Sequence, residues 1–136
     1  WGINGDGGLG DGTQIGKTLP IQPKLPSGEK FKKVYAANSG SSCSLALSMS
    51  GRMYAWGGNC GYFTLASGYN YEYLTPGLIP NLFGVEDFSA LDHQVAIVLL
   101  NGTVWGYGSR DAQFGSGTIG DYSGGIPVQA IGLNLN

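Results

Sequence analysis

The stretch SLALSMSGRMYAWG, residues 44–57, has a counterpart in VAIVLLNGTVWGYG, residues 95–108, which lies 51 positions further along the chain. Both stretches join two β-type runs of apolar and aromatic residues through turn residues, which is typical of a β-hairpin. The turns fall at Ser50-Gly51 and Asn101-Gly102. Asn-Gly favours a two-residue turn in which both residues take positive φ angles, so we expect tight two-residue turns.

The duplication extends beyond the hairpins in both directions. FKKVYA, residues 31–36, precedes the first hairpin as VEDFSA, residues 85–90, precedes the second. On the other side a proline follows each aromatic-Gly step at a nearly constant distance: Pro20 follows Trp1, Pro76 follows Trp56 and Pro127 follows Tyr107. This shared order of strand, hairpin, aromatic-Gly step and proline segment indicates an internal repeat.

The repeat predicts an all-β chain. Gly or Pro interrupts nearly every window long enough for a helix, and no apolar stripe persists at helical spacing. One unit cannot bury both faces of its own sheet, so neighbouring units must cover it. The run VAIVLL, apolar on both faces, suits a strand between two such sheets. The expected strands are residues 33–37, 44–49, 52–57, 86–91, 95–100 and 103–108, with a proline strand at 127–133.

Composition excludes several classes of function. The net charge is −2 and only 12% of residues are charged, which leaves no basic surface for nucleic acid. The longest apolar run, VAIVLL, is far shorter than the roughly 18 residues that a membrane-spanning helix needs. The 25 glycines exceed average usage, yet a hydrophobic content of 42% argues for a folded core. We therefore expect no nucleic-acid partner and no membrane span.

The two cysteines, Cys43 and Cys60, do not form a C-x-x-C pair, and His93 is the only histidine. A zinc site needs about four such ligands, so we expect no metal. The two-residue turn places Cys43 opposite Gly58 and makes Cys60 a diagonal neighbour, so the cysteines form either a disulfide or two buried thiols. Two cysteines in a Gly-, Tyr- and Ser-rich chain favour an oxidising compartment, and hence an extracellular or secreted protein.

The first residues, WGINGDGGLG, carry Gly5, Gly7 and Gly10 at the G-x-G-x-x-G spacing of a nucleotide-binding loop. Such a loop must follow a strand and open a helix. Here TQIGKTLPIQPKLP, residues 13–26, contains three prolines and cannot make that helix. The aromatic-Gly step recurs in both later copies, and the glycine spacing does not. We interpret the stretch as a glycine-rich connection and expect no cofactor.

The segment KKVYAANSGSSCSLALSMSGRMYAWGGN, residues 32–59, resembles the repeat of the regulator of chromosome condensation family. That repeat reads aliphatic-A-x-G-x-x-H-S-L-A-L, a short turn with Gly, and V-Y-A-W-G-x-N. WGINGDGGLGDG, residues 1–12, is similar to its next part, W-G-x-N-x-x-G-x-L-G-x-G, with Gly8 where Gln is usual. The third copy is degenerate, with Tyr107 in place of Trp. The family's histidine position is Cys43 in the first complete unit.

The resemblance implies an all-β fold, a β-propeller-type repeat array of four-stranded antiparallel blades. The chain then supplies about 2.5 blades in one array over residues 1–136, as part of a larger propeller or of an assembly. Its expected segments are a blade tail and glycine-rich connection at 1–19, a blade at 20–57, a Tyr-rich connection at 58–75, a blade at 76–108, and a connection with the next blade's first strand at 109–136. We expect other protein to cover Trp1 and strand 127–133, because open blades expose apolar faces and strand edges.

No residue pattern provides a nucleophile for His93, so we expect no catalytic base. Three groups of residues are candidates for structural or binding roles. Trp1, Trp56 and Tyr107 are expected to be wedges between blades. The cluster of Tyr62, Phe63, Tyr69, Tyr71 and Tyr73 either contacts a partner or covers its own blade edge. Asn101 begins the tripeptide NGT, a candidate N-glycosylation site at an exposed hairpin tip.

These observations predict a non-enzymatic propeller-repeat scaffold that acts through protein–protein contact, as a segment of a larger protein or as a self-associating unit. The resemblance also implies two alternatives: a guanine-nucleotide exchange factor-like regulator, and an enzyme inhibitor that binds by its loop face. In each case the partner is a protein, whether the rest of the chain, further copies or another molecule.

Overall fold

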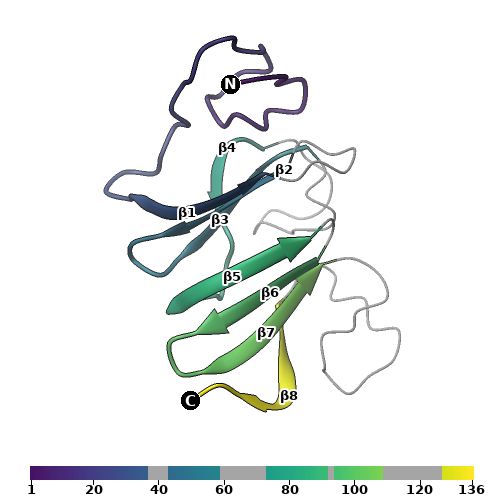
Figure 1. Ribbon diagram of the computed structural model, residues 1–136. Helices are drawn as coiled ribbons and strands as arrows, with labels where there is room; N and C mark the ends of the chain where they lie inside the picture. Colours follow the sequence, from purple (N-terminus) through teal and green to yellow (C-terminus); the bar gives the residue numbers. More distant parts are fainter. Residues whose placement is uncertain (37–42, 59–72, 92–93, 109–126) are drawn as a thin grey trace.

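The computed structural model describes residues 1–36, 43–58, 73–91, 94–108 and 127–136 (Figure 1). These residues form two four-stranded antiparallel sheets, each with its strands in sequential order. The first sheet contains β1 (Phe31–Ala36), β2 (Cys43–Ser48), β3 (Met53–Gly57) and β4 (Tyr73–Leu78). The second contains β5 (Val85–Leu91), β6 (Gln94–Leu99), β7 (Thr103–Gly108) and β8 (Val128–Asn134). The predicted all-β fold is confirmed, and no helix long and apolar enough to cross a membrane occurs in the described part of the chain.

Each sheet ends, rather than begins, with a proline strand. β4 contains Pro76, and β8 begins one residue after Pro127. Blades were expected at 20–57 and 76–108, whereas the sheets run from 31 to 78 and from 85 to 134. The difference arises because β4 pairs with β3, and β8 with β7, across the connection that follows each hairpin. The other strands lie within two residues of their expected positions.

The hairpin turns differ from the expected two-residue turns. The N–H of Gly51 donates to the carbonyl oxygen of Ser48 at 3.1 Å, and that of Gly102 donates to Leu99 at 2.8 Å. Only the glycines take positive φ angles, 75° and 79°, so each loop has three residues, 49–51 and 100–102. This geometry avoids the cost of a left-handed Ser or Asn beside the glycine.

The longer turn also changes the register of the first hairpin. Leu47 pairs with Met53, and Cys43 pairs with Gly57. The expectation that Cys43 lies opposite Gly58 was therefore wrong by one residue, because it assumed the shorter turn.

The two sheets repeat their irregularities as well as their strands. β1 and β5 each carry a register shift near the first residue, at 31–33 and at 85–87. After Pro76 the chain reaches Asn81 with φ of 58°, and 51 positions later Gly132 has φ of 74°. Residues 79–85, which lead from the first sheet into the second, are thus the structural counterpart of residues 130–136.

The core lies between the two sheets. Leu45, Leu47, Met53 and Ala55 alternate along β2 and β3, so they share the face that packs on the second sheet. Val85, Phe88, Val95 and Ile97 form the opposing face, and Ile79 and Leu82 of the connection join the same buried cluster. One apolar face of each sheet is therefore removed from water by the other.

Polar contacts fix the first strands of the sheets against each other. The Lys33 Nζ atom lies 2.6 Å from the Asp87 carboxylate, donates to the Phe88 carbonyl oxygen at 2.5 Å, and sits 5.0 Å from the centre of the Phe88 ring. The Lys33 hydrogen bond is the main cause that holds the pKa of Asp87 below its usual value. The N–H of Val85 also donates to the carbonyl oxygen of Gly51 at 3.0 Å.

The strand buried on both faces is β2 rather than β6. Every residue of β2 is buried, because one face packs on the second sheet and the other lies under the N-terminal segment, residues 1–30. In β6, Val95 and Ile97 are buried while Ala96 is exposed and Val98 half-buried. The run VAIVLL, expected between two sheets, is thus covered on one face only.

Leu82 and Leu133, which are 51 positions apart, provide a matched test of this core. Leu82 is 2% exposed between the sheets, whereas Leu133 is 47% exposed. Leu82→Ala should lower the free energy of unfolding by about 2–5 kcal/mol, because it opens a cavity in the core. Leu133→Ala should lower it by at most about 1 kcal/mol, since half of its surface already lies in water. Denaturant unfolding of the two variants measures the difference, and equal losses would contradict the described core.

Candidate functional site

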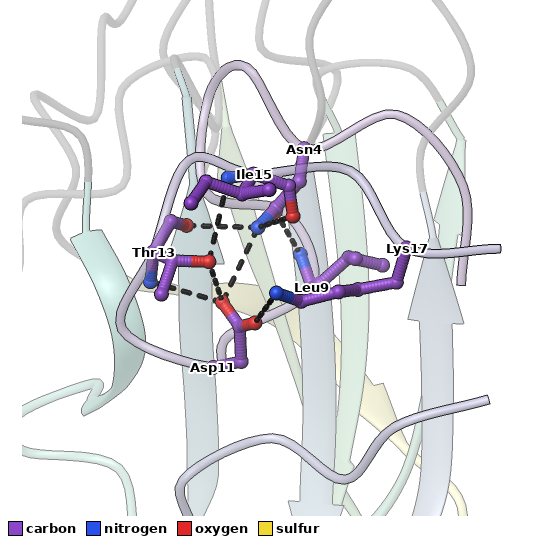
Figure 2. Close-up of polar contacts among 6 residues, drawn as sticks. All are labelled: Asn4, Leu9, Asp11, Thr13, Ile15 and Lys17. Atoms are coloured by element: carbon purple, nitrogen blue, oxygen red, sulfur yellow. Dashed lines mark hydrogen bonds and ion pairs between the residues drawn. The ribbon is translucent and has the colours of Figure 1, made fainter. Parts of the chain in front are cut away.

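The N-terminal stretch folds as a loop around one buried side chain, Asn4 (Figure 2). Its Nδ2 amide donates to the carbonyl oxygen of Thr13 at 2.8 Å and to Oδ1 of Asp11 at 3.2 Å. Its Oδ1 atom accepts the backbone N–H of Leu9 at 2.8 Å. Both ends of the Asn4 amide therefore have partners, which compensates for its burial.

Asp11 is the charged centre of the same loop (Figure 2). Its Oδ1 atom accepts the hydroxyl of Thr13 at 2.7 Å and the backbone N–H of Thr13 at 2.9 Å, and the Lys17 Nζ atom lies 3.5 Å from Oδ2. The Thr13 hydroxyl is the main cause that holds the pKa of Asp11 below its usual value. Asp11 is therefore ionised at neutral pH and engaged by donors of its own loop.

Several backbone amides of this loop already have acceptors within the protein, which argues against a phosphate cradle. A phosphate cradle needs several backbone N–H groups directed at the ligand. Here the N–H of Gly7 donates to Asn4, that of Gly10 to Gly7, and that of Gly12 to Leu74, at 2.8–3.0 Å. The glycines thus serve tight turns and close packing within the protein.

The loop docks on the first sheet through the carbonyl oxygen of Gly8. Trp56 Nε1 donates to this oxygen at 2.9 Å, and Ser44 Oγ donates to it at 2.8 Å. Gly10 approaches the indole so closely that a Cβ atom there would lie 2.7 Å from Trp56 Nε1. The Phe31 ring stacks on Trp56 with 5.9 Å between centroids. Trp56 is therefore clamped between the first sheet and the N-terminal loop.

Glu29 joins the N-terminal segment to the β2–β3 hairpin. Its Oε1 atom accepts the hydroxyls of Ser50 at 2.9 Å and Tyr54 at 3.0 Å. Burial acts to raise the pKa of Glu29, but the hydrogen bonds from Ser50 and Tyr54 outweigh it and leave the pKa below its usual value. Burial, followed by the contact with Glu29, raises the pKa of Tyr54. At neutral pH an ionised carboxylate thus accepts from a neutral phenol, which makes the contact a charge-assisted hydrogen bond.

The three expected wedge residues lie in different environments. Trp56 is 5% exposed, whereas Trp1 is 73% exposed. A wedge role for Trp1 therefore requires another protein to cover it and stays a prediction. Tyr107 lies in β7, and its side chain is outside the described residues.

The other candidate residues fall partly outside the described ranges. Tyr73 is half-buried at the start of β4 and packs on the first sheet, while Tyr62, Phe63, Tyr69 and Tyr71 lie outside the described residues. Cys43 is disulfide-bonded, and the chain's other cysteine, Cys60, is outside the described residues, as is His93. Asn101 is exposed at the tip of the β6–β7 hairpin. In the described residues, no three His, Cys, Asp or Glu side chains lie together in a way that could hold a metal ion.

Among the described residues, none covers the outer apolar face of the second sheet. Leu45, Leu47 and Met53 of the first sheet are fully buried against the second. Their counterparts on the second sheet, which face away from the first, are exposed or half-buried. These counterparts are Ala96, Val98 and Val104.

The two termini lie at opposite ends of the stack of sheets (Figure 1). Each of these ends carries exposed or half-buried apolar side chains. The C-terminal apolar surface consists of Val98, Val104, Ile131, Leu133 and Leu135. The N-terminal apolar surface consists of Trp1, Ile3, Ile15 and Leu19. Contiguous patches of exposed apolar residues are typical of sites that contact other protein.

The structural roles of Asn4 and of the contact between Lys33 and Asp87 were not predicted from the sequence. The Asn4-Gly5 dipeptide is typical of an ordinary turn. The burial of the Asn4 side chain depends on hydrogen bonds to Asp11 and Thr13, which lie seven and nine residues further along the chain. The contact of Lys33 with Asp87 joins residues 54 positions apart and has no local signal. The one clue was an Asn three residues after both Trp1 and Trp56, at Asn4 and Asn59.

No protein-family model matches the sequence. Solved structures do match the fold. Human WBSCR16 superposes with a TM-score of 0.71 and 22% identity over 94% of this chain and 31% of its own. Prp20p from Saccharomyces cerevisiae superposes with a TM-score of 0.69 and 22% sequence identity, over 96% of this chain and 33% of its own. Yeast RCC1 (Prp20), solved bound to Kap60, superposes with a TM-score of 0.66 and 20% sequence identity, over 96% of this chain and 32% of its own.

The fold is that of a regulator of chromosome condensation-type propeller. The repeat recognised in the sequence is thereby confirmed, and the two sheets correspond to two of its blades. The chain spans about a third of the length of the solved structures that it matches, so it represents a partial propeller.

Trp56 and Trp1 form a matched pair for testing the docking of the N-terminal loop. Trp56→Ala should lower the free energy of unfolding by about 3–5 kcal/mol, because it empties a buried site. It also removes the donor to the Gly8 carbonyl oxygen. In the monomer, Trp1→Ala should change stability by no more than about 0.5 kcal/mol, since its side chain is 73% exposed there. Thermal or denaturant unfolding measures both, and a stable Trp56→Ala variant would show that the loop does not depend on this indole.

Proposed function

We propose that the chain is a non-enzymatic segment of a propeller-type scaffold that acts through protein–protein contact. The observation that carries this proposal is the C-terminal apolar surface. Three of its residues, Val98, Val104 and Leu133, are the counterparts of Leu47, Met53 and Leu82, which are buried between the two sheets. Repeat arrays bury such faces against a neighbouring unit, and an uncovered face is a site of association.

Proteins of the same fold support the nature of the partner. The structure of Prp20p was determined together with its binding properties to Gsp1p and histones, and yeast RCC1 (Prp20) was solved bound to Kap60. We propose a protein partner for this chain as well: the rest of a longer chain, further copies, or a different protein. Because fold alone does not define function, only the class of partner is carried over.

The polar groups of the described residues support a structural rather than a catalytic role. Asn4, Asp11, Glu29 and Lys33 each contact donors or acceptors of the protein itself. Asp11, Glu29 and Asp87 have lowered pKa values, which suits stable ionised contacts and not a proton-transferring acid.

Sedimentation velocity of the 136-residue chain tests the proposal. We expect concentration-dependent oligomers or filaments, because the exposed apolar surfaces at the two ends can cover each other. Leu133→Glu, at a side chain that is 47% exposed and whose counterpart Leu82 is buried between the sheets, places a charge in the C-terminal apolar surface and should shift the chain toward monomer.

Met49→Glu is the matched control, because Met49 is 68% exposed but lies at the β2–β3 tip, away from both surfaces. This variant should associate like the unaltered chain. A compact, soluble monomer of the unaltered chain at all concentrations would refute the proposal. Affinity capture with the intact chain then distinguishes the alternatives, since a small GTPase would favour an exchange regulator and a hydrolase would favour an inhibitor.

A further inference from the structure

Asn101-Gly102-Thr103 is the only N-x-S/T tripeptide of the sequence, and the structure places it at the β6–β7 hairpin tip. Asn101 is exposed there, in the loop formed by residues 100–102. We propose that Asn101 is a modification site that carries an N-linked oligosaccharide. The tripeptide alone occurs by chance in many proteins, so the proposal depends on three features of the fold.

The first feature is the set of contacts at the Asn101 side chain. Its Oδ1 atom accepts the backbone N–H of Thr103 at 3.1 Å and the Thr103 hydroxyl at 2.7 Å. Both contacts use the oxygen, whereas a sugar is attached to Nδ2. A glycosylated amide keeps its carbonyl oxygen as an acceptor, so the modification preserves the turn.

The second feature is the exposure of the hairpin tip, which can be judged from the equivalent tip of the first sheet. Ser50 is the counterpart of Asn101, and it stays exposed although the first sheet is covered on both faces. Gly51 contacts the following segment through the N–H of Val85 at 3.0 Å, and Gly102 makes the matching contact with the N–H of Leu135 at 2.9 Å. A glycan at Asn101 would therefore remain in water even when another protein covers the second sheet.

The third feature is the disulfide at Cys43. Disulfides form and persist in oxidising compartments such as the secretory pathway, where oligosaccharides are also transferred to asparagine. The donor would be an oligosaccharide linked to a lipid through pyrophosphate. The Nδ2 atom of Asn101 bonds to the anomeric carbon of the sugar and loses a proton, while the carbon–oxygen bond to pyrophosphate breaks and the lipid pyrophosphate leaves.

The test is translation of the full chain, behind a cleavable leader, into eukaryotic microsomes and in secreting cells. We expect one added oligosaccharide, which peptide N-glycosidase removes while converting the Asn101 amide to a carboxylate. Asn101→Gln and Thr103→Ala should migrate at the mass of the bare polypeptide. Thr103→Ser, which keeps a hydroxyl at this position, should retain the glycan.

Microsomal transfer takes place during translation, so a variant that folds poorly still reports on the site. The unaltered chain at the mass of the bare polypeptide, in microsomes that glycosylate a control protein, would overturn the proposal. An added mass that persists in Asn101→Gln would also overturn it. Neither result bears on the association measured by sedimentation, so this proposal and the proposed function fail separately.

Discussion

Leu45, Leu47 and Met53 are removed from water because they share one buried cluster with residues of the next sheet, such as Val85, Phe88 and Ile97. Burial of each such side chain is worth about 1.5–3 kcal/mol, so the shared face outweighs every polar contact between the sheets. The ion pair of Lys33 with Asp87 is partly exposed, and pairs of this kind contribute about 0–1 kcal/mol. The ion pair therefore aligns β1 with β5, while burial of the apolar face provides most of the free energy that holds the sheets together.

Because each sheet must bury its apolar face against a neighbouring segment, the two ends of the chain differ. On the N-terminal side, residues 1–30 cover the first sheet, with Gly8 accepting from Trp56 and Ser44 and with Glu29 accepting from Tyr54. On the C-terminal side, the second sheet presents the same face that the first sheet buries, and no described residue covers it. A sheet that carries an apolar face on each side is stable as one member of a stack, which connects the repeat in the sequence to the proposed role in protein–protein contact.

The repeat predicted the strands and the fold because each copy carries its own local signals: alternating apolar residues, a glycine turn and an aromatic-Gly step. Three features depend on contacts that such signals do not contain. The turns have three residues because Ser50 and Asn101 avoid positive φ angles, and this shifted Cys43 by one residue relative to β3. The proline segments close the preceding sheets, since the sequence gives the order of strands but not their pairing. Asn4 is buried by partners up to 11 residues away, and its N-G dipeptide resembles an ordinary turn.

The central claim is that the two sheets share one core and unfold together. Native-state hydrogen exchange at the amides of Ala46 and Ile97 tests it most directly, because these residues occupy equivalent positions in the central strands β2 and β6. A shared core predicts that both amides exchange through the same global opening, with equal free energies and equal dependence on denaturant. Opening free energies that differ by more than about 2 kcal/mol would mean that each sheet unfolds by itself, and that result would contradict the account.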